Sequence, residues 1–202
     1  MTTTNITTNN TRSIGYTDLI TQIEAKLEEK PHVIVAISGF GGSGKSHLAE
    51  KLRKDFNCKE NQVVRIDHLY GPNPNGPDIF DQSDWPLLIQ ILEDVRSGKR
   101  LCYQGKGYRG EIIPYDEDLP TVIIVEGIRL LQPKLMSYFD ISVWIDCPQT
   151  LARDRAKTRD RAQGEPEETV LLWDTDWGPK DTLYFETYHP RTLATFLYEQ
   201  YQ

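Results

Sequence analysis

An apolar run followed directly by a glycine-rich turn restricts the fold of this chain more than any other feature. Residues 32–38 read HVIVAIS, which is typical of a strand buried on both faces of a parallel sheet. GFGGSGKS follows at residues 39–46, and helical apolar spacing runs from Lys45 to Phe56. A strand, a glycine turn and a helix in this order predict an α/β domain with an anion site at the turn.

The octapeptide fits the phosphate-loop (Walker A) pattern G-x-x-x-x-G-K-[ST]. Its glycines allow positive φ angles and bring consecutive amides onto phosphate oxygens. Lys45 is expected to reach the β- and γ-phosphates, and the Ser46 hydroxyl to join a Mg²⁺ shell. We therefore expect ATP and Mg²⁺ as cofactors. The residues expected to bind the nucleotide in this loop are Gly39, Gly41, Gly42, Ser43, Gly44, Lys45, Ser46 and His47.

Two other nucleotide sites compete with this interpretation. Gly39, Gly41 and Gly44 also match G-x-G-x-x-G, and Asp67 ends the next expected strand, as a dinucleotide site would require. The Lys-Ser pair after the last glycine favours phosphate binding instead. A GTPase would need an N-K-x-D guanine reader, and this tetrapeptide does not occur in the sequence.

Strands and helices alternate along the rest of the chain. Further strands are expected at residues 62–67, 121–127 and 141–146, and amphipathic helices at 17–30 and 85–97. This alternation predicts a P-loop NTPase fold: a doubly wound, mainly parallel sheet of about five strands with a helical lid.

The domain boundaries follow from composition. Residues 1–13 form a polar Thr/Asn tract and are expected to be a flexible tail, so that 14–202 make one domain with its lid at about 150–165. The aromatic residues of the C-terminal region 166–202 are interpreted as packing residues, and the region receives no assigned role.

Acidic residues close two of the expected strands. Asp67 ends the strand at 62–67 and could accept the proton of an attacking hydroxyl, while Glu126 ends TVIIVE and could hold Mg²⁺. Ligands of open α/β sheets lie beyond the carboxyl ends of strands, which favours functional roles over helix capping or solvation. Basic residues from Arg153 to Arg161 could balance phosphate charge, with Arg155 and Arg159 on one helical face. A solvated helix neutralised by Asp154 and Asp160 is the alternative.

With these residues, the chain resembles the uridine kinase branch of the P-loop kinases, over about residues 32–165. The matching elements are GGSGKS, IDHLY, IFDQSDWP, IIPYDED, VEGIRLL and the basic ARDRAKTRDR. The resemblance implies that Asp67 is the general base and that Glu126 and Ser46 hold Mg²⁺. It also implies that Tyr70, Asp81 and Tyr115 line the acceptor site and that Arg155 and Arg159 contact phosphates. Lys45, Asp67 and Arg159 are thus the expected catalytic set.

The segment between Tyr115 and Thr121 is shorter than the base-reading hairpin of uridine kinases, and the C-terminal stretch also differs. The expected reaction is therefore γ-phosphate transfer to a hydroxyl of a small molecule, a nucleoside first. Pantothenate, nicotinamide riboside, glycerate or a sugar phosphate are alternative acceptors. A non-catalytic nucleotide-binding module is a further alternative.

Charge and cysteine content limit the partners and the compartment. A net charge of -7 and an isoelectric point near 5.2 argue against a broad nucleic-acid interface. Three cysteines without close spacing are typical of reduced thiols in a cytoplasm. No apolar run is long enough to span a bilayer, so no membrane contact is expected. The resemblance to the uridine kinase branch also implies a homo-oligomer.

Overall fold

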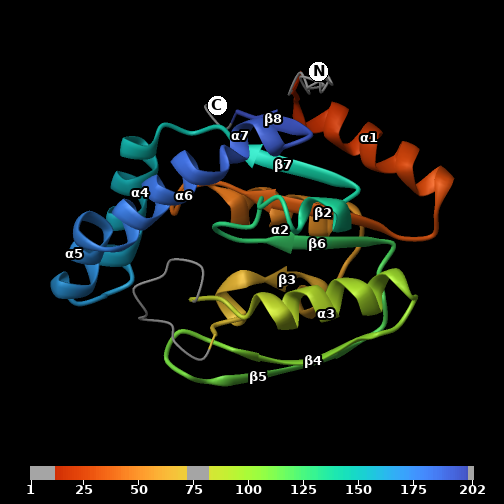
Figure 1. Cartoon of the computed structure of the whole chain (residues 1–202), viewed down its shortest axis with the longest axis horizontal. Helices are drawn as coiled ribbons and strands as arrows, with labels where there is room; N and C mark the ends of the chain where they lie inside the picture. The colour runs from red at the N-terminus through yellow and green to blue at the C-terminus, as the bar shows by residue number, and fades with distance from the viewer. Residues whose placement is uncertain (1–11, 72–81, 200–202) are drawn as a thin grey trace, which may run out of the picture.

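A computed structural model of the chain describes residues 12–71 and 82–199 (Figure 1). Its central element is a six-stranded parallel sheet in the order β1-β8-β7-β2-β6-β3. These strands are β1 (Arg12–Ser13), β2 (Val33–Ser38), β3 (Val64–Arg65), β6 (Val122–Glu126), β7 (Ile141–Ile145) and β8 (Phe196–Tyr198). The expected doubly wound P-loop NTPase fold is confirmed, with six strands in place of about five.

The middle of the sheet is formed by the three apolar runs of the sequence. β2 lies between β6 and β7, with Ile37 opposite Glu126 and Ser38 opposite Trp144. Every residue of these three strands is buried. Burying a large aliphatic side chain contributes about 1.5–3 kcal/mol, so this apolar centre holds the sheet together.

Helices connect the strands and cover the sheet. They are α1 (Tyr16–Glu29), α2 (Lys45–Asp55), α3 (Trp85–Arg96), α4 (Gln149–Ala162), α5 (Glu167–Thr175), α6 (Trp177–Tyr188) and α7 (Pro190–Leu193). In Figure 1 the arrows of β6 and β7 point toward the side where α4, α5 and α6 gather. The carboxyl ends of the strands therefore face the C-terminal helices. No helix within the described residues is long and apolar enough to cross a membrane.

Two parts of the sheet differ from the sequence-based expectation. The strand expected at 62–67 is only β3, and a 3₁₀ turn at Ile66–His68 follows it. The short strand pairs on one side only, Val64 with Val125 and Arg65 with Glu126, so the ladder ends where this partner ends. Arg12 and Ser13, assigned to the tail by composition, instead pair with Phe196 and Leu197 of β8.

An antiparallel hairpin of β4 (Leu101–Lys106) and β5 (Ile112–Glu117) lies beyond the β3 edge of the sheet (Figure 1). Its strands alternate between buried and exposed positions and contain Gly105 and Pro114, so they lack the apolar runs that mark the central strands. The hairpin contacts the segment that follows β3, because the backbone amide of Tyr70 donates to the Lys106 carbonyl at 2.9 Å.

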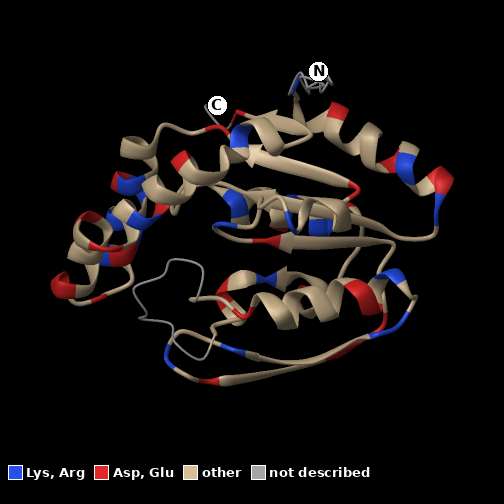
Figure 2. Ribbon diagram, viewed as in Figure 1, with Lys and Arg blue, Asp and Glu red and all other residues tan. Residues whose placement is uncertain are grey.

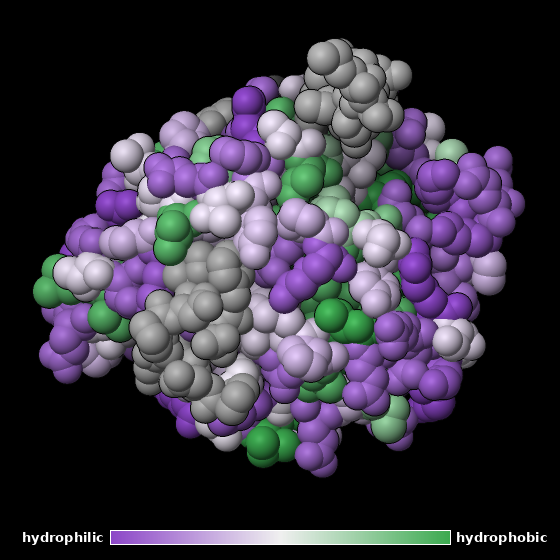
Figure 3. Space-filling model, viewed as in Figure 1, coloured by the Kyte–Doolittle hydropathy of each residue, from purple (hydrophilic) through white to green (hydrophobic). Residues whose placement is uncertain are grey.

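The molecular surface is mainly hydrophilic on the face drawn in Figure 3, where apolar residues form small separate patches. Figure 2 shows basic and acidic residues mixed along α4 and α5, at the carboxyl end of the sheet. Lys157 pairs with Asp174 at 2.6 Å and Arg161 with Glu167 at 2.6 Å. Part of the expected basic density on the lid is therefore balanced by α5.

Candidate active site

The phosphate loop joins β2 to α2 at the carboxyl edge of the sheet. Gly42 and Gly44 have φ angles of 81° and 102°, a region that suits glycine and few other residues. A side chain at Gly42 would also clash with the Ala152 carbonyl of α4. The glycines are therefore required both by the turn and by the helix that packs on it.

The loop amides fall into two groups. Gly41 donates to Asp181 Oδ2 at 3.1 Å, and Ser43 donates to the Phe40 carbonyl at 3.0 Å. The amides of Gly42, Lys45 and Ser46 have no acceptor in the described part of the chain. Since Lys45 and Ser46 begin α2, their amides can bind an anion at the positive end of the helix.

Lys45 lies at the centre of the charged groups of the site. Its ammonium donates to the Phe40 carbonyl at 2.9 Å, and the residue is 8% exposed. Burial lowers the pKa of Lys45, while the nearby carboxylates of Glu126, Asp67 and Asp181 oppose this shift. Carboxylates from three separate elements therefore offset part of the effect of burial on this ammonium group.

Glu126, at the end of β6, faces Ser46 in the first turn of α2. The Ser46 hydroxyl donates to Glu126 Oε1 at 3.2 Å, and Arg65 Nη1 lies 3.0 Å from the same oxygen. A hydroxyl and a carboxylate are hard oxygen ligands that suit Mg²⁺, which usually takes one or two protein ligands plus phosphate oxygens and water. Within residues 12–71 and 82–199, no cluster of three His, Cys, Asp or Glu could hold a metal alone. The two residues thus fit a Mg²⁺ that is shared with a nucleotide.

Asp67 lies in the 3₁₀ turn after β3 rather than at the end of a strand. Its side chain is exposed, and its charge acts on Lys45 and on Tyr70. The early end of β3 therefore leaves Asp67 at the same edge as the phosphate loop. A buried ammonium, a hydroxyl–carboxylate pair and an exposed carboxylate meet there, and this combination can bind a polyphosphate and deprotonate an acceptor.

Comparisons with known proteins show kinases that are similar to this chain. No protein-family model matches the chain. A uridine kinase of Staphylococcus aureus (strain JH9) is 28% identical over 159 residues, which cover 70% of this chain and 75% of the relative. This similarity supports the resemblance to the uridine kinase-like P-loop kinases.

Solved structures support the fold of this kinase. A candidate fructose transport system kinase from Silicibacter sp. TM1040 aligns with a TM-score of 0.73 at 21% identity, covering 92% of this chain and 99% of the other. A candidate uridine kinase from Bacillus stearothermophilus aligns with a TM-score of 0.59 at 17% identity, covering 90% and 99%. The D-glycerate 3-kinase of Cryptococcus neoformans aligns with a TM-score of 0.60 at 12% identity, covering 89% of each chain. The P-loop kinase fold is therefore shared. The similarity to a uridine kinase supports the activity of a small-molecule kinase.

The residues expected to line the acceptor site, Tyr70 and Tyr115, differ in how far they are buried. Tyr115 is 5% exposed and stacks on Tyr103 with ring centroids 4.4 Å apart, while its hydroxyl bonds His68 Nδ1. Tyr115 is therefore connected to the site through His68, the neighbour of Asp67. Tyr70 is half-buried, and burial together with Asp67 raises the pKa of its hydroxyl. Asp81 lies outside the described residues.

The lid helix α4 packs on the loop through Ala152 and Ala156, which lie against Gly42. Arg159 lies near enough to Lys45 to lower the pKa of that ammonium, although its guanidinium is bonded to Asp160 Oδ1 at 2.7 Å. Arg155 contacts Cys147 Sγ at 3.9 Å. The two arginines therefore both lie on the lid helix, and neither has a described hydrogen bond to the phosphate loop.

His47, which was expected to bind the nucleotide, is exposed on α2.

The C-terminal region, which the sequence left without a role, supplies two residues of the site. Trp173 of α5 lies against Gly41, where any added side chain would clash with its ring. Its Nε1 donates to Asp160 Oδ2 at 2.6 Å. Asp181 of α6 bonds the Gly41 amide from 140 positions away in sequence. No local pattern marks these residues, because their roles depend on contacts between distant segments.

Proposed function

We propose that this kinase transfers the γ-phosphate of ATP to a hydroxyl of a nucleoside-like small molecule. The observation that carries the proposal is the meeting of Lys45, the Ser46–Glu126 pair and Asp67 at one edge of the sheet. Lys45 and Ser46 come from α2, Glu126 from β6, and Asp67 from the turn after β3. A nucleotide-binding module without chemistry would not need an exposed carboxylate beside the phosphate loop.

The phosphates of ATP would lie on the open amides of Gly42, Lys45 and Ser46. The Lys45 ammonium would neutralise charge on the β- and γ-phosphates. Ser46 and Glu126 would hold Mg²⁺, which supplies further neutralisation of the phosphate oxygens when bound. The Arg65–Glu126 contact of 3.0 Å keeps this carboxylate paired with a cation.

Asp67 would act on the acceptor. In the transfer, the acceptor oxygen forms a bond to the γ-phosphorus, the bond to the β–γ bridging oxygen breaks, and ADP leaves. The proton of the acceptor hydroxyl would pass to Asp67, a carboxylate that no described ion pair neutralises. Arg159 and Arg155 would approach the transferred phosphate from α4.

Aromatic side chains next to Tyr70, whose hydroxyl feels the charge of Asp67, favour an acceptor with a planar group. The ring centroid of Tyr108 lies 5.4 Å from that of Tyr70 and 6.3 Å from that of Trp177, and Tyr108 is 44% exposed. Such rings can stack on a base. Glycerate and sugar acceptors are the second candidates, because kinases with those names share the fold.

The deciding experiment is an ADP-release assay with ATP, Mg²⁺ and a panel of acceptors. The panel contains uridine and other nucleosides, nicotinamide riboside, pantothenate, glycerate, fructose and sugar phosphates. We expect the highest kcat/KM with a nucleoside. An Asp67→Asn variant should still bind ATP and lose roughly 10²–10⁴-fold in transfer rate. ATP binding without transfer to any acceptor would favour the non-catalytic module.

A further inference from the structure

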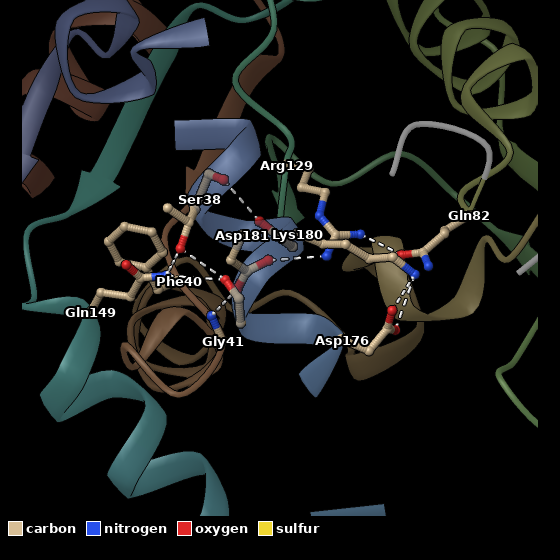
Figure 4. A network of polar contacts seen from close by, with 12 residues as sticks. Ser38, Phe40, Gly41, Gln82, Arg129, Gln149, Asp176, Lys180 and Asp181 are labelled. Atoms are coloured by element: carbon tan, nitrogen blue, oxygen red, sulfur yellow. Dashed lines mark hydrogen bonds and ion pairs between the residues drawn. The ribbon is translucent and has the colours of Figure 1, made fainter. Parts of the chain in front are cut away.

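A buried ion pair joins the phosphate loop to the C-terminal helix α6 (Figure 4). Asp181 uses both carboxylate oxygens: Oδ2 accepts the Gly41 amide at 3.1 Å, and Oδ1 lies 3.1 Å from Arg129 Nη2. The side chains of Arg129 and Asp181 are 3% and 6% exposed. Since both are removed from water, their charges must be balanced within the protein.

Arg129 connects this pair to a third segment. Its Nη1 donates to Gln82 Oε1 at 2.5 Å, and Gln82 is itself buried. The three side chains come from the loop after β6, from α6 and from the residues just before α3. One guanidinium therefore links the phosphate loop, through Asp181, to the segment that precedes α3.

The backbone of Arg129 indicates that its side chain is needed at this position. Its φ angle is 57°, in the left-handed region where glycine is at ease and an arginine is strained. The Arg129 carbonyl is held by Gln132 Nε2 at 2.7 Å. A glycine would relieve the strain, but it would leave Asp181 without its cation.

Stability alone is a weak reason for such a pair. Replacing a buried ion pair by apolar residues of similar volume is often neutral or stabilising, because desolvation offsets the attraction. Asp181 also lies at the phosphate loop, since its Oδ2 accepts the Gly41 amide at 3.1 Å, and its charge acts on Lys45. An uncompensated carboxylate in this place would repel a polyphosphate.

We propose that Arg129 and Asp181 are positioning residues for the phosphate loop. The Asp181 carboxylate holds the Gly41 amide, so that the neighbouring Gly42 amide stays directed toward the nucleotide. Arg129 neutralises that carboxylate and keeps it from repelling the phosphates. This inference rests on the proposed nucleotide binding and adds the residues that keep the loop ready for it.

Three variants separate the hydrogen bond from the charge. Asp181→Ala removes the acceptor of the Gly41 amide, Asp181→Asn keeps an acceptor oxygen without charge, and Arg129→Met leaves the carboxylate without its cation. The matched control is Tyr184→Phe, on the same helix α6 as Asp181. It removes a buried hydrogen bond of 2.9 Å from the Tyr184 hydroxyl to the Leu131 carbonyl. Calorimetric titration with a non-hydrolysable ATP analogue and, separately, with adenosine measures the contribution of the phosphates.

The expected order of affinities is specific. Asp181→Ala and Arg129→Met should each weaken binding of the ATP analogue by roughly 5- to 150-fold, while Asp181→Asn stays within about threefold of the wild type. Adenosine binding should be unchanged in all of them, and Tyr184→Phe should bind both ligands as the wild type does. If Asp181→Ala and Asp181→Asn differ by less than about threefold for the ATP analogue, the positioning role is wrong.

Amide hydrogen exchange of the wild type provides a test that needs no variant. The Gly41 amide should exchange slowly without nucleotide, and the Gly42 amide should become protected only when the ATP analogue binds. Rapid exchange at Gly41 would overturn the inference even if Asp181→Ala fails to fold. If the wild type does not bind the analogue, the proposed function fails, whereas the exchange at Gly41 still reports on the pair by itself.

Discussion

The indole ring of Trp173 lies against Gly41, so that the C-terminal helix α5 rests directly on the phosphate loop. The ring is anchored on its other side by the bond from Nε1 to Asp160, at the end of the lid helix α4. One side chain therefore connects the lid, the loop and the C-terminal region. A substitution at Gly41 should therefore disturb the packing of the lid, the loop and the C-terminal region.

Gly41→Ala should destabilise the protein by overpacking, because the new methyl group would overlap the Trp173 ring. We expect a loss of about 1–3 kcal/mol, which lowers the Tm by roughly 2–4 °C for each kcal/mol. Adding Trp173→Ala should make the Gly41→Ala change much less costly in a double-mutant cycle measured by thermal unfolding. Gly15→Ala, where the added group meets only Asp18 at 3.9 Å, is the control. Additive losses in the cycle would mean that the two residues are not coupled.

Lys45→Met should weaken ATP binding, because it removes the charge that faces the phosphates. Hydrogen bonds to charged groups contribute about 1.5–3 kcal/mol, which corresponds to roughly 10- to 150-fold in affinity. Equilibrium binding of a fluorescent ATP analogue measures this loss. Lys54→Met, an exposed lysine of the same helix that pairs with Glu50, should bind like the wild type. Equal affinity of Lys45→Met and Lys54→Met would remove Lys45 from the binding site.

Glu126→Gln should raise the Mg²⁺ concentration needed for half-maximal transfer. The amide can still accept the Ser46 hydroxyl, but it lacks the charge that attracts the ion. The expected increase is roughly 10- to 100-fold. A Mg²⁺ titration of ADP release at fixed ATP measures it, with Glu117→Gln, which pairs with the surface residue Lys59, as control. An unchanged Mg²⁺ requirement would contradict the role of Glu126.

His68 should make the folded state less stable in weak acid. Burial, helped by the nearby Arg65, lowers the pKa of His68 below its usual 6.5. Below about pH 6.5, His68 is protonated in the unfolded chain but stays neutral in the folded chain. The free energy of unfolding therefore falls as the pH decreases toward the folded-state pKa. Urea unfolding between pH 5 and 8 measures the slope, which His68→Gln should flatten. His47→Gln, on the exposed surface of α2, should leave the slope as in the wild type, and a steep slope in His68→Gln would assign the effect to other groups.

The sequence alone was sufficient for the phosphate loop and for the central strands. Buried parallel strands need continuous apolar runs, and the glycines before Lys45 need positive φ angles, so both features are written in local patterns. The hairpin of β4 and β5 was missed because its strands are only half-buried and contain Gly105 and Pro114. The length of β3 was overestimated, since a strand ends where its partner ends, and Val125 and Glu126 are distant in sequence.

The residue types and spacing of the chain determined that it would build an α/β sheet with an anion-binding loop at Gly39–Ser46. Only the tertiary structure decided that Trp173 and Asp181 would join that loop, and that Tyr115 would turn its hydroxyl to His68. The physical reason is the range of the forces involved. Backbone preferences and apolar periodicity act over a few neighbouring residues, whereas a hydrogen bond to Gly41 requires only that the folded sheet bring α6 within reach.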